Sequence, residues 1–197
     1  MPKPRGDVGR PPVTSREELE QVALELFDER GFEATTVDDV AGAAGISRRT
    51  FFRYYPSKND VVWGDFEHRL LTMESQLAGA DPAVPVLEAL ADVVVRFNAL
   101  PPEAVPAHRR RMAMVLHVPA LQAHSALRYA DWRAVVARFV ARRSRHGEDD
   151  AVPQLVGHVA LAIAVASYEQ WLADPTSELE PIMAASFTEL LGGFPGL

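Results

Sequence analysis

Four consecutive residues, Ser47, Arg48, Arg49 and Thr50, carry side chains that can bind nucleic acid. A guanidinium can bridge N7 and O6 of guanine, and a threonine can contact a thymine methyl group or form a polar bond. The wider segment 47–58 adds further cations and contains no acidic residue. These side chains predict a surface that reads DNA, although the same pair of arginines in isolation is also compatible with a solvated helix face.

Two short helices joined by a glycine turn would position these side chains. Thr36 begins a capping box, which predicts the start of one helix, and Gly45 predicts its end. Ser47 caps the second helix, which should stop near Tyr55 because Pro56 disfavours helix at the residue before it. In a helix-turn-helix unit the second helix enters the major groove with its N-terminal residues toward the base edges. Phe51 and Tyr55 are expected to pack inward because they lie one turn apart.

Helices are predicted on both sides of this pair. Ser15 and Glu18 form a capping box at the start of a helix that Gly31 ends. Ser57 caps a helix that is expected to run to about Ala78. Further helices are expected over 84–100, 103–117, 119–145, 152–173 and 177–191. The chain is therefore predicted to be all-α, with about nine helices and no alternating strand pattern.

Composition excludes several classes of function. The 197 residues include no cysteine, so disulfides, thiolate zinc sites and a cysteine nucleophile are excluded. A net charge of −7 would argue against nucleic-acid binding if the charges were spread evenly over the chain. They are not, because segment 47–58 contains cations and no acidic residue. No apolar run approaches the ~18–20 residues of a membrane span. We expect a cytoplasmic protein that does not enter a membrane, with no catalytic site, no metal site and no cofactor.

The chain resembles the TetR family of bacterial transcriptional regulators over residues 23–61, ALELFDERGFEATTVDDVAGAAGISRRTFFRYYPSKNDV. An apolar pair late in the first helix, a Gly-aromatic step, a Thr-Thr-Val helix start, a glycine turn, an aromatic second helix and a Ser-Lys pair occur in the family's order. The run SRRTFFRYYPSKNDVVWGDF further resembles the regulators encoded with mycofactocin biosynthesis genes. The resemblance implies a helix-turn-helix DNA-binding domain over 15–60 and a helical ligand-binding and dimerisation domain over 61–197.

The resemblance also implies roles for individual residues. Thr36, Phe52, Tyr54 and Lys58 match positions that usually hold phosphates, and Ser47, Arg48, Arg49 and Thr50 match positions that face bases or nearby phosphates; Arg53 completes the expected DNA-binding set. Two residues depart from the family pattern. Phe52 replaces the common tyrosine and so lacks a hydroxyl for phosphate, and Arg49 replaces a frequent small residue and so adds a possible base reader. Residues 1–14 are expected to be a disordered basic arm that either touches DNA phosphates or remains a solvated tail.

The remaining helices are expected to hold a ligand and to form a dimer. The family builds its interface from the last two long helices, here 152–173 and 177–191, and the middle helices enclose a pocket. The pocket candidates, each of which is otherwise a core residue, are Phe97, Met112, Leu116, His117, Leu121, His124, Trp132 and Phe139. The interface candidates, with intrachain core as the alternative, are Gly157, Leu161, Ala164, Tyr168 and Trp171.

The implied function is that of a ligand-responsive regulator, most simply a repressor. It would bind a palindromic double-stranded DNA operator as a homodimer, and a small-molecule effector would release it. Acyl-CoA thioesters are a recurrent effector class in the family and would suit an apolar cavity with an arginine mouth. The arginine clusters at 109–111 and 142–145 either line the entrance of such a cavity or are solvated surface. The alternatives are a helical interaction module without DNA binding and an all-α enzyme.

Overall fold

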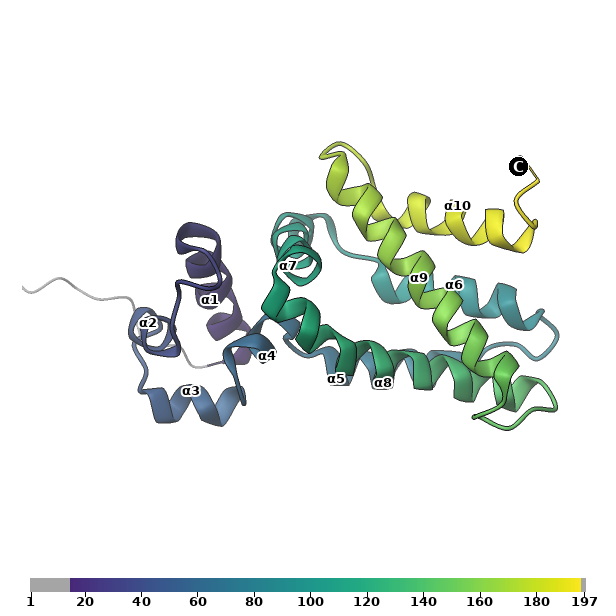
Figure 1. The fold of residues 1–197 in the computed structure, drawn as a ribbon, viewed down its shortest axis with the longest axis horizontal. Coiled ribbons are helices and arrows are strands. Elements are labelled where there is room, and N and C mark those ends of the chain that lie inside the picture. The colour runs from purple at the N-terminus through teal and green to yellow at the C-terminus, as the bar shows by residue number, and fades with distance from the viewer. Residues whose placement is uncertain (1–14, 196–197) are drawn as a thin grey trace, which may run out of the picture. The chain divides into compact units, whose positions relative to one another are not determined.

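The computed structural model describes residues 15–195, which are helical and contain no strand (Figure 1). Ten α-helices and one short 3-10 helix lie within this range, so the all-α prediction is confirmed. Contacts divide the chain into two units, the first ending at Gly64 and the second beginning at Asp65. The basic arm predicted over residues 1–14 lies outside the described residues.

The first unit consists of four helices, which are α1 (Arg16–Arg30), α2 (Val37–Ala43), α3 (Arg48–Tyr54) and α4 (Lys58–Trp63). Helix α1 starts with the predicted capping box, in which the Ser15 hydroxyl accepts from the Glu18 amide and the Glu18 carboxylate accepts from the Ser15 amide. The inner side of α1 packs against α2 and α4, and α2 packs against α3. Leu19, Phe27, Val40 and Phe51 are among the residues that form this small core.

The helix expected to run from Ser57 to about Ala78 is two helices, so this prediction was wrong. Helix α4 ends at Gly64, and α5 (Phe66–Ala78) begins after it. Gly64 has a φ of 58° and a ψ of −132°, a conformation that a residue with a side chain rarely adopts. A Cβ at this position would lie 2.6 Å from a carboxylate oxygen of Glu20. The sequence alone suggested a glycine tolerated inside a helix, and tertiary packing instead uses its backbone freedom.

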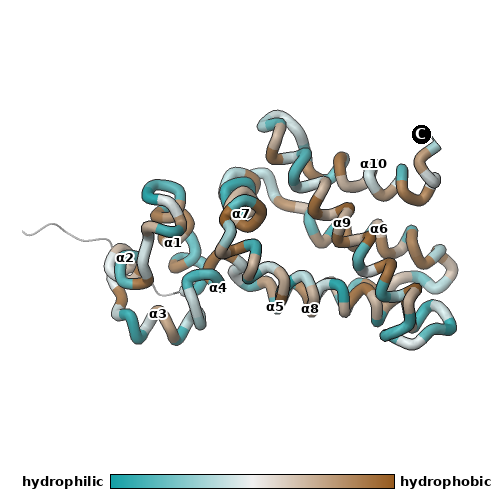
Figure 2. The backbone as a smooth tube through the Cα atoms, viewed as in Figure 1, coloured by the Kyte–Doolittle hydropathy of each residue, from teal (hydrophilic) through white to brown (hydrophobic). Residues whose placement is uncertain are grey.

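The second unit contains the other helices, which are α5, α6 (Val86–Asn98), the 3-10 helix η1 (Pro102–Ala104), α7 (Val105–His117), α8 (Pro119–Arg143), α9 (Ala151–Ala173) and α10 (Leu179–Leu191). Apart from the break at Gly64, the predicted C-terminal helices are present with ends shifted by about two residues or less, which is within the usual uncertainty of helix ends. Helix α9 packs along α8 and α10, and α6 packs against α5 and α10 (Figure 1). Figure 2 shows hydrophilic residues concentrated in the turn between α8 and α9.

Helix α9 is long and apolar enough to cross a membrane by length and composition alone. Only 33% of its most apolar 18-residue window is buried within the chain. Length and composition are weak grounds for a span, because a core helix of a folded bundle has the same properties. Since α8 and α10 cover part of α9, the feature that needs explanation is its uncovered apolar surface.

Candidate nucleic-acid interface

Helix α2, which precedes α3, is fixed by hydrogen bonds at both of its ends. At the start of α2, the Thr36 hydroxyl accepts from the Asp39 amide at 3.1 Å, and Asp39 accepts from the Thr36 amide at 2.8 Å. The Thr36 hydroxyl and amide both donate to the Asp39 carboxylate, and these two bonds hold the pKa of this half-buried carboxyl below its usual value. At its end, Ile46 donates to the Ala41 carbonyl and Gly45, with a φ of 66°, donates to the Gly42 carbonyl. This is the Schellman arrangement, which favours glycine at the position that Gly45 occupies.

Helix α3 turns one side inward and presents its N-terminal turn to solvent. The Ser47 hydroxyl caps it by accepting from the Thr50 amide at 3.1 Å. Phe51 and Tyr55 have exposed fractions of 0% and 1%, which confirms that they pack inward. Arg48, Arg49, Phe52 and Arg53 are exposed. The predicted readers therefore lie on the outer side of a helix that is anchored by its aromatic side chains.

The two candidate base readers have different surroundings. Arg48 forms an ion pair with Asp38 on α2 at 2.9 Å, and its guanidinium lies 5.5 Å from the centre of the Phe52 ring. Arg49 has no ion-pair partner within residues 15–195. Because both partners of the Arg48–Asp38 pair are well exposed, the pair is worth at most about 1 kcal/mol. The Arg49 side chain is therefore exposed without an ion pair in the described range, whereas the Arg48 guanidinium is held by Asp38.

Lys58 is the predicted phosphate ligand whose surroundings are most crowded. Its ammonium donates to the carbonyls of Phe32 at 2.6 Å and Thr35 at 2.8 Å, and it lies 4.1 Å from the centre of the Phe32 ring. Burial is the main cause that lowers its pKa. An ammonium has three N–H donors, so Lys58 closes the loop between α1 and α2 with two of them and has a third for another acceptor.

Three contacts from α1 hold the end of α3, and the sequence did not reveal them. Arg16 donates to the Tyr54 carbonyl at 2.8 Å and its guanidinium lies 4.8 Å from the centre of the Tyr55 ring. The Tyr55 hydroxyl donates to the Glu20 carboxylate. Arg16 and Glu20 are one helical turn apart, which is the only sequence signal for a shared task. Arg16 and Glu20 thereby hold the C-terminal end of α3 against α1.

The predicted pocket residues occupy several different environments in the second unit. Trp132 and Phe139 belong to the buried core, and Phe97, Met112 and Leu116 pack at its edge and are partly exposed. Leu121 is fully buried and His124 is half-buried. His117 is exposed at the end of α7, where its Nδ1 lies 2.9 Å from the Ala113 carbonyl.

Four of the five predicted interface residues, Gly157, Ala164, Tyr168 and Trp171, are buried within a single chain. Tyr168 and Trp171 have exposed fractions of 7% and 1% and pack beside His108 of α7. Gly157 is buried, and a Cβ there would lie 3.1 Å from the Arg133 carbonyl oxygen of α8. The periodicity of α9 did not reveal which side α8 covers. Leu161 is partly exposed, and Ala164 is 7% exposed.

Two arginines of the predicted clusters bind backbone carbonyls. Arg109 donates to the Trp171 carbonyl, to Asp174 at 3.2 Å and to Ser177 at 3.3 Å, and so holds the turn between α9 and α10. Arg143 donates to the carbonyls of Pro82 and Val84 in the turn between α5 and α6. Neither side chain is simply solvated surface, and both connect helices of the second unit.

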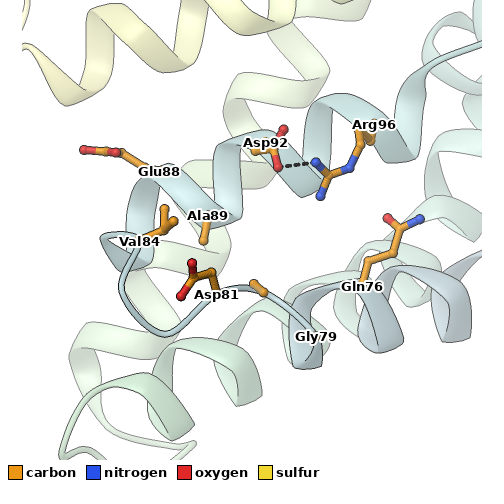
Figure 3. A pocket seen from close by; sticks show the side chains of 9 residues that line it. Gln76, Gly79, Asp81, Val84, Glu88, Ala89, Asp92 and Arg96 are labelled. Atoms are coloured by element: carbon orange, nitrogen blue, oxygen red, sulfur yellow. Dashed lines mark hydrogen bonds and ion pairs between the residues drawn. The ribbon is translucent and has the colours of Figure 1, made fainter.

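Three hollows on the second unit are compared as possible binding sites. One, of about 470 Å³, lies beside the turn between α5 and α6 and has acidic side chains around it, with Arg96 paired to Asp92 (Figure 3). Another, of about 360 Å³, lies between α5 and α8 and is rimmed by Glu67, Glu74, Asp131 and Arg138. The third, of about 270 Å³, has a wholly apolar lining from α6, α9 and α10. No group of three or more metal-ligating side chains is found in the part of the chain that the structure describes.

Together, a capped turn and an α3 that is buried on one side and cationic on the other define a helix-turn-helix protein. Comparison with known proteins agrees with this class. The family described as bacterial regulatory proteins, tetR family, matches residues 21–62, and the family described as MftR C-terminal domain matches residues 84–195. The chain therefore belongs to the TetR family of transcriptional regulators, within the group that carries the MftR C-terminal domain.

Individual relatives agree with this assignment over nearly the whole chain. A candidate mycofactocin biosynthesis transcriptional regulator, MftR of Mycobacterium tuberculosis, is 41% identical over 96% of both chains. Two solved structures share the fold at lower identity. The repressor FadR of Thermus thermophilus, solved with lauroyl-CoA, has a TM-score of 0.58 at 24% identity and covers 91% of this chain and 94% of its own. A TetR-family protein of Syntrophomonas wolfei has a TM-score of 0.68 at 17% identity, with 92% and 95% covered.

Proposed function

We propose that this regulator is a cytoplasmic repressor that binds a palindromic operator as a homodimer and leaves it when a small-molecule effector binds. The observation that carries the proposal is the exposed N-terminal turn of α3, in which Arg48 and Arg49 stand on a helix anchored by Phe51. In this arrangement the arginines reach base edges and specify sequence, while other contacts to phosphate fix the register. The protein acts through binding alone.

The phosphate contacts are assigned to residues around the readers. Ser47 and Thr50 lie beside the arginines at the start of α3. Phe52 supplies no hydroxyl, so it contributes apolar contact with the sugar-phosphate backbone and support for Arg48. The full proposed DNA-binding set is Thr36, Ser47, Arg48, Arg49, Thr50, Phe52, Arg53, Tyr54 and Lys58.

The uncovered side of α9, together with α10, is the proposed dimer interface. Leu155 of α9 is 62% exposed and Leu191 of α10 is 42% exposed, and both line the apolar hollow of about 270 Å³. Exposed apolar patches of this kind commonly mark protein interfaces. A second copy would cover them and place two α3 helices on half-sites about 34–36 Å apart. Leu161, which is partly exposed, remains in the proposed interface, whereas the buried Gly157, Ala164, Tyr168 and Trp171 are left out of it.

An acyl-CoA thioester is the proposed class of effector. Support comes from FadR, whose structure contains lauroyl-CoA, and from the partly exposed apolar side chains of Phe97, Met112 and Leu116 at the edge of the core. Release requires the effector to bind better to a conformation that no longer fits the operator, and the operator must then weaken effector binding by the same factor. Isothermal titration with lauroyl-CoA at tens of micromolar tests this step, and no detectable heat of binding would refute it.

A gel shift on the regulator's own promoter tests the DNA-binding step. We expect a complex whose affinity falls steeply with salt, because phosphate contacts release counterions. Replacing Arg48 and Arg49 together by alanine should abolish preference for the operator over unrelated DNA and leave the dimer intact in gel filtration. Wild-type selectivity in that double variant would remove the two arginines as readers. A failure of the wild-type protein to shift any DNA would favour a helical interaction module.

A further inference from the structure

A buried polar cluster lies inside the second unit, where α6, α7 and α9 meet. Its three side chains, Asn98, His108 and Tyr168, have exposed fractions of 7%, 8% and 7%. The Tyr168 hydroxyl donates to the Asn98 side-chain oxygen at 2.8 Å, and His108 Nε2 lies 2.9 Å from the same hydroxyl. The Asn98 amide in turn donates to the Val94 carbonyl at 2.8 Å. Each of these side chains is therefore engaged within the cluster.

Burial, together with these bonds, leaves the cluster without charge at neutral pH. Because the Tyr168 hydroxyl gives its proton to Asn98, His108 must donate from Nε2, as both the neutral Nε2–H tautomer and the imidazolium can. Burial lowers the pKa of His108 to about 3, with Arg69 and Arg111 adding to the effect. Burial also raises the pKa of Tyr168. At neutral pH these three side chains form an uncharged polar surface, here called the polar wall. They supply no negative charge to a neighbouring cation.

Arg69 of α5 is that neighbouring cation. Its guanidinium donates to the Phe97 carbonyl at 2.7 Å and lies 4.8 Å from the centre of the Phe97 ring. Burial lowers its pKa, and the proximity of Arg111 contributes to the same effect. Within residues 15–195 no carboxylate lies within ion-pair distance of Arg69, and only one of its five N–H donors forms a hydrogen bond. A half-buried guanidinium without a counter-ion is uncommon, because buried charges are normally paired.

The surroundings of Arg69 change from polar to apolar along α7. His108, Met112 and Leu116 follow at intervals of four residues and so lie along one side of the helix. Met112 and Leu116 pack at the edge of the core together with Phe97, the ring next to Arg69. A cation therefore stands at one end of a partly exposed apolar strip. This arrangement matches a molecule with an anionic group at one end of an apolar chain.

The hollows found on the second unit suit an anion less well. The hollow beside the α5–α6 turn is surrounded by Asp81, Glu88 and Asp92, and the Asp92 carboxylate already holds Arg96 (Figure 3). The hollow between α5 and α8 is rimmed by three carboxylates, and Arg138 there is paired with Glu74 at 3.0 Å. Negative charge at both sites would repel an anionic group, whereas Arg69 would attract one.

We propose that Arg69 is the anchor for the effector, and that the group it binds is a carboxylate or a phosphate on an apolar chain. The anchor rests on the proposed function, since it assumes that an effector enters the second unit. The free N–H donors of Arg69 form charge-assisted hydrogen bonds to the anionic oxygens, which are the stronger class of hydrogen bond. The neutral wall of His108 and Tyr168 leaves the positive charge of Arg69 uncompensated until the ligand binds.

Isothermal titration of the full-length protein without DNA tests the anchor with three ligands of equal chain length. Decanoate carries a carboxylate, decyl phosphate carries a phosphate, and 1-decanol carries neither charge. We expect at least one of the two acids to bind about tenfold or more tightly than the alcohol, as hydrogen bonds to charged groups allow. The acid that binds more tightly identifies the anionic group.

Variants separate an anchor from a structural residue. Arg69→Gln should lose the preference for acid over alcohol and keep the wild-type affinity for 1-decanol, a result that general damage to the fold would not produce. Arg69→Lys should retain part of the preference, and Arg142→Gln, on an exposed part of α8, should retain all of it. No preference in the wild-type protein, no binding of any ligand, or an unchanged preference in Arg69→Gln would each overturn the proposal. If the wild-type protein prefers the acids to the alcohol but does not bind the operator in the gel shift, the repressor function is refuted. The assignment of Arg69 as the ligand anchor is then still supported.

Discussion

Arg48 and Arg49 are adjacent in the sequence, but their side chains have different surroundings in the protein without DNA. Arg48 is held by Asp38 and rests near Phe52, whereas Arg49 has no ion-pair partner in the described range. The sequence predicted both as readers because of their place at the start of a capped helix. It did not identify Asp38 as a competitor, because the pair joins two helices and depends on the angle between them.

Asp38→Asn should strengthen operator binding by up to about fivefold. The change removes an exposed ion pair worth at most about 1 kcal/mol, which Arg48 must otherwise give up, and it removes a negative charge close to the phosphates. Fluorescence anisotropy with a labelled operator measures the effect. Glu29→Gln on α1 is the matched control, since it changes the net charge equally at an exposed site without this ion pair. Equal affinities for the two variants would show that Asp38 does not restrain Arg48.

At the scale of the element, helix starts and turns were predictable from local chemistry. The capping boxes at Ser15 and Thr36 and the glycine at Gly45 act through residues within one turn, so the sequence contains all that is needed. The break at Gly64 was missed because its cause is a contact with Glu20 of α1, far away in the sequence. The hold of Arg16 and Glu20 on α3 was missed for the same reason.

Gly64→Ala should destabilise the protein by about 1–3 kcal/mol. The alanine would have to adopt a positive φ, which costs about 1–2 kcal/mol, and its Cβ would displace the Glu20 carboxylate that accepts from Tyr55. Urea denaturation followed by circular dichroism measures the loss. Gly42→Ala is the control, because a Cβ there meets nothing within 4 Å inside α2 and should stabilise the helix by about 0.5–1 kcal/mol. If the two variants unfold at the same urea concentration, the strain assigned to Gly64 is not real.

At the scale of the whole molecule, the family and the all-α architecture followed from the sequence, while the division of α9 between core and surface did not. Helix α9 is apolar on nearly all sides, so its sequence cannot distinguish the side that meets α8 from the side left uncovered. Tyr168 and Trp171 were for this reason placed at the interface although they are core residues. The proposed role of Arg69 could not be predicted from the sequence either, because its surroundings are formed where four helices meet.

The same buried cluster should make the stability of the whole protein depend on pH. The pKa of His108 is about 3 in the folded protein and about 6.5 in an unfolded chain. Between these values the unfolded state binds a proton that the folded state refuses, so the free energy of unfolding falls as the pH falls through this window. One such group changes the free energy of unfolding by up to about 1.4 kcal/mol per pH unit. This slope reaches its full value well below pH 6.5 and is absent above pH 7.

Urea denaturation at pH 7.5, 6.0, 5.0 and 4.5 measures this dependence. Wild-type protein should lose stability more steeply over the acidic part of the series than His108→Gln, which has no proton to gain at this site. The glutamine keeps a donor for the Tyr168 hydroxyl, so the variant should fold at pH 7.5 with a moderate loss of about 1–3 kcal/mol from an imperfect buried bond. His146→Gln, an exposed histidine in the turn between α8 and α9, should follow the wild-type curve. If His108→Gln also follows that curve, His108 takes up its proton equally in the folded and the unfolded protein, and the cluster beside Arg69 becomes positively charged at acidic pH.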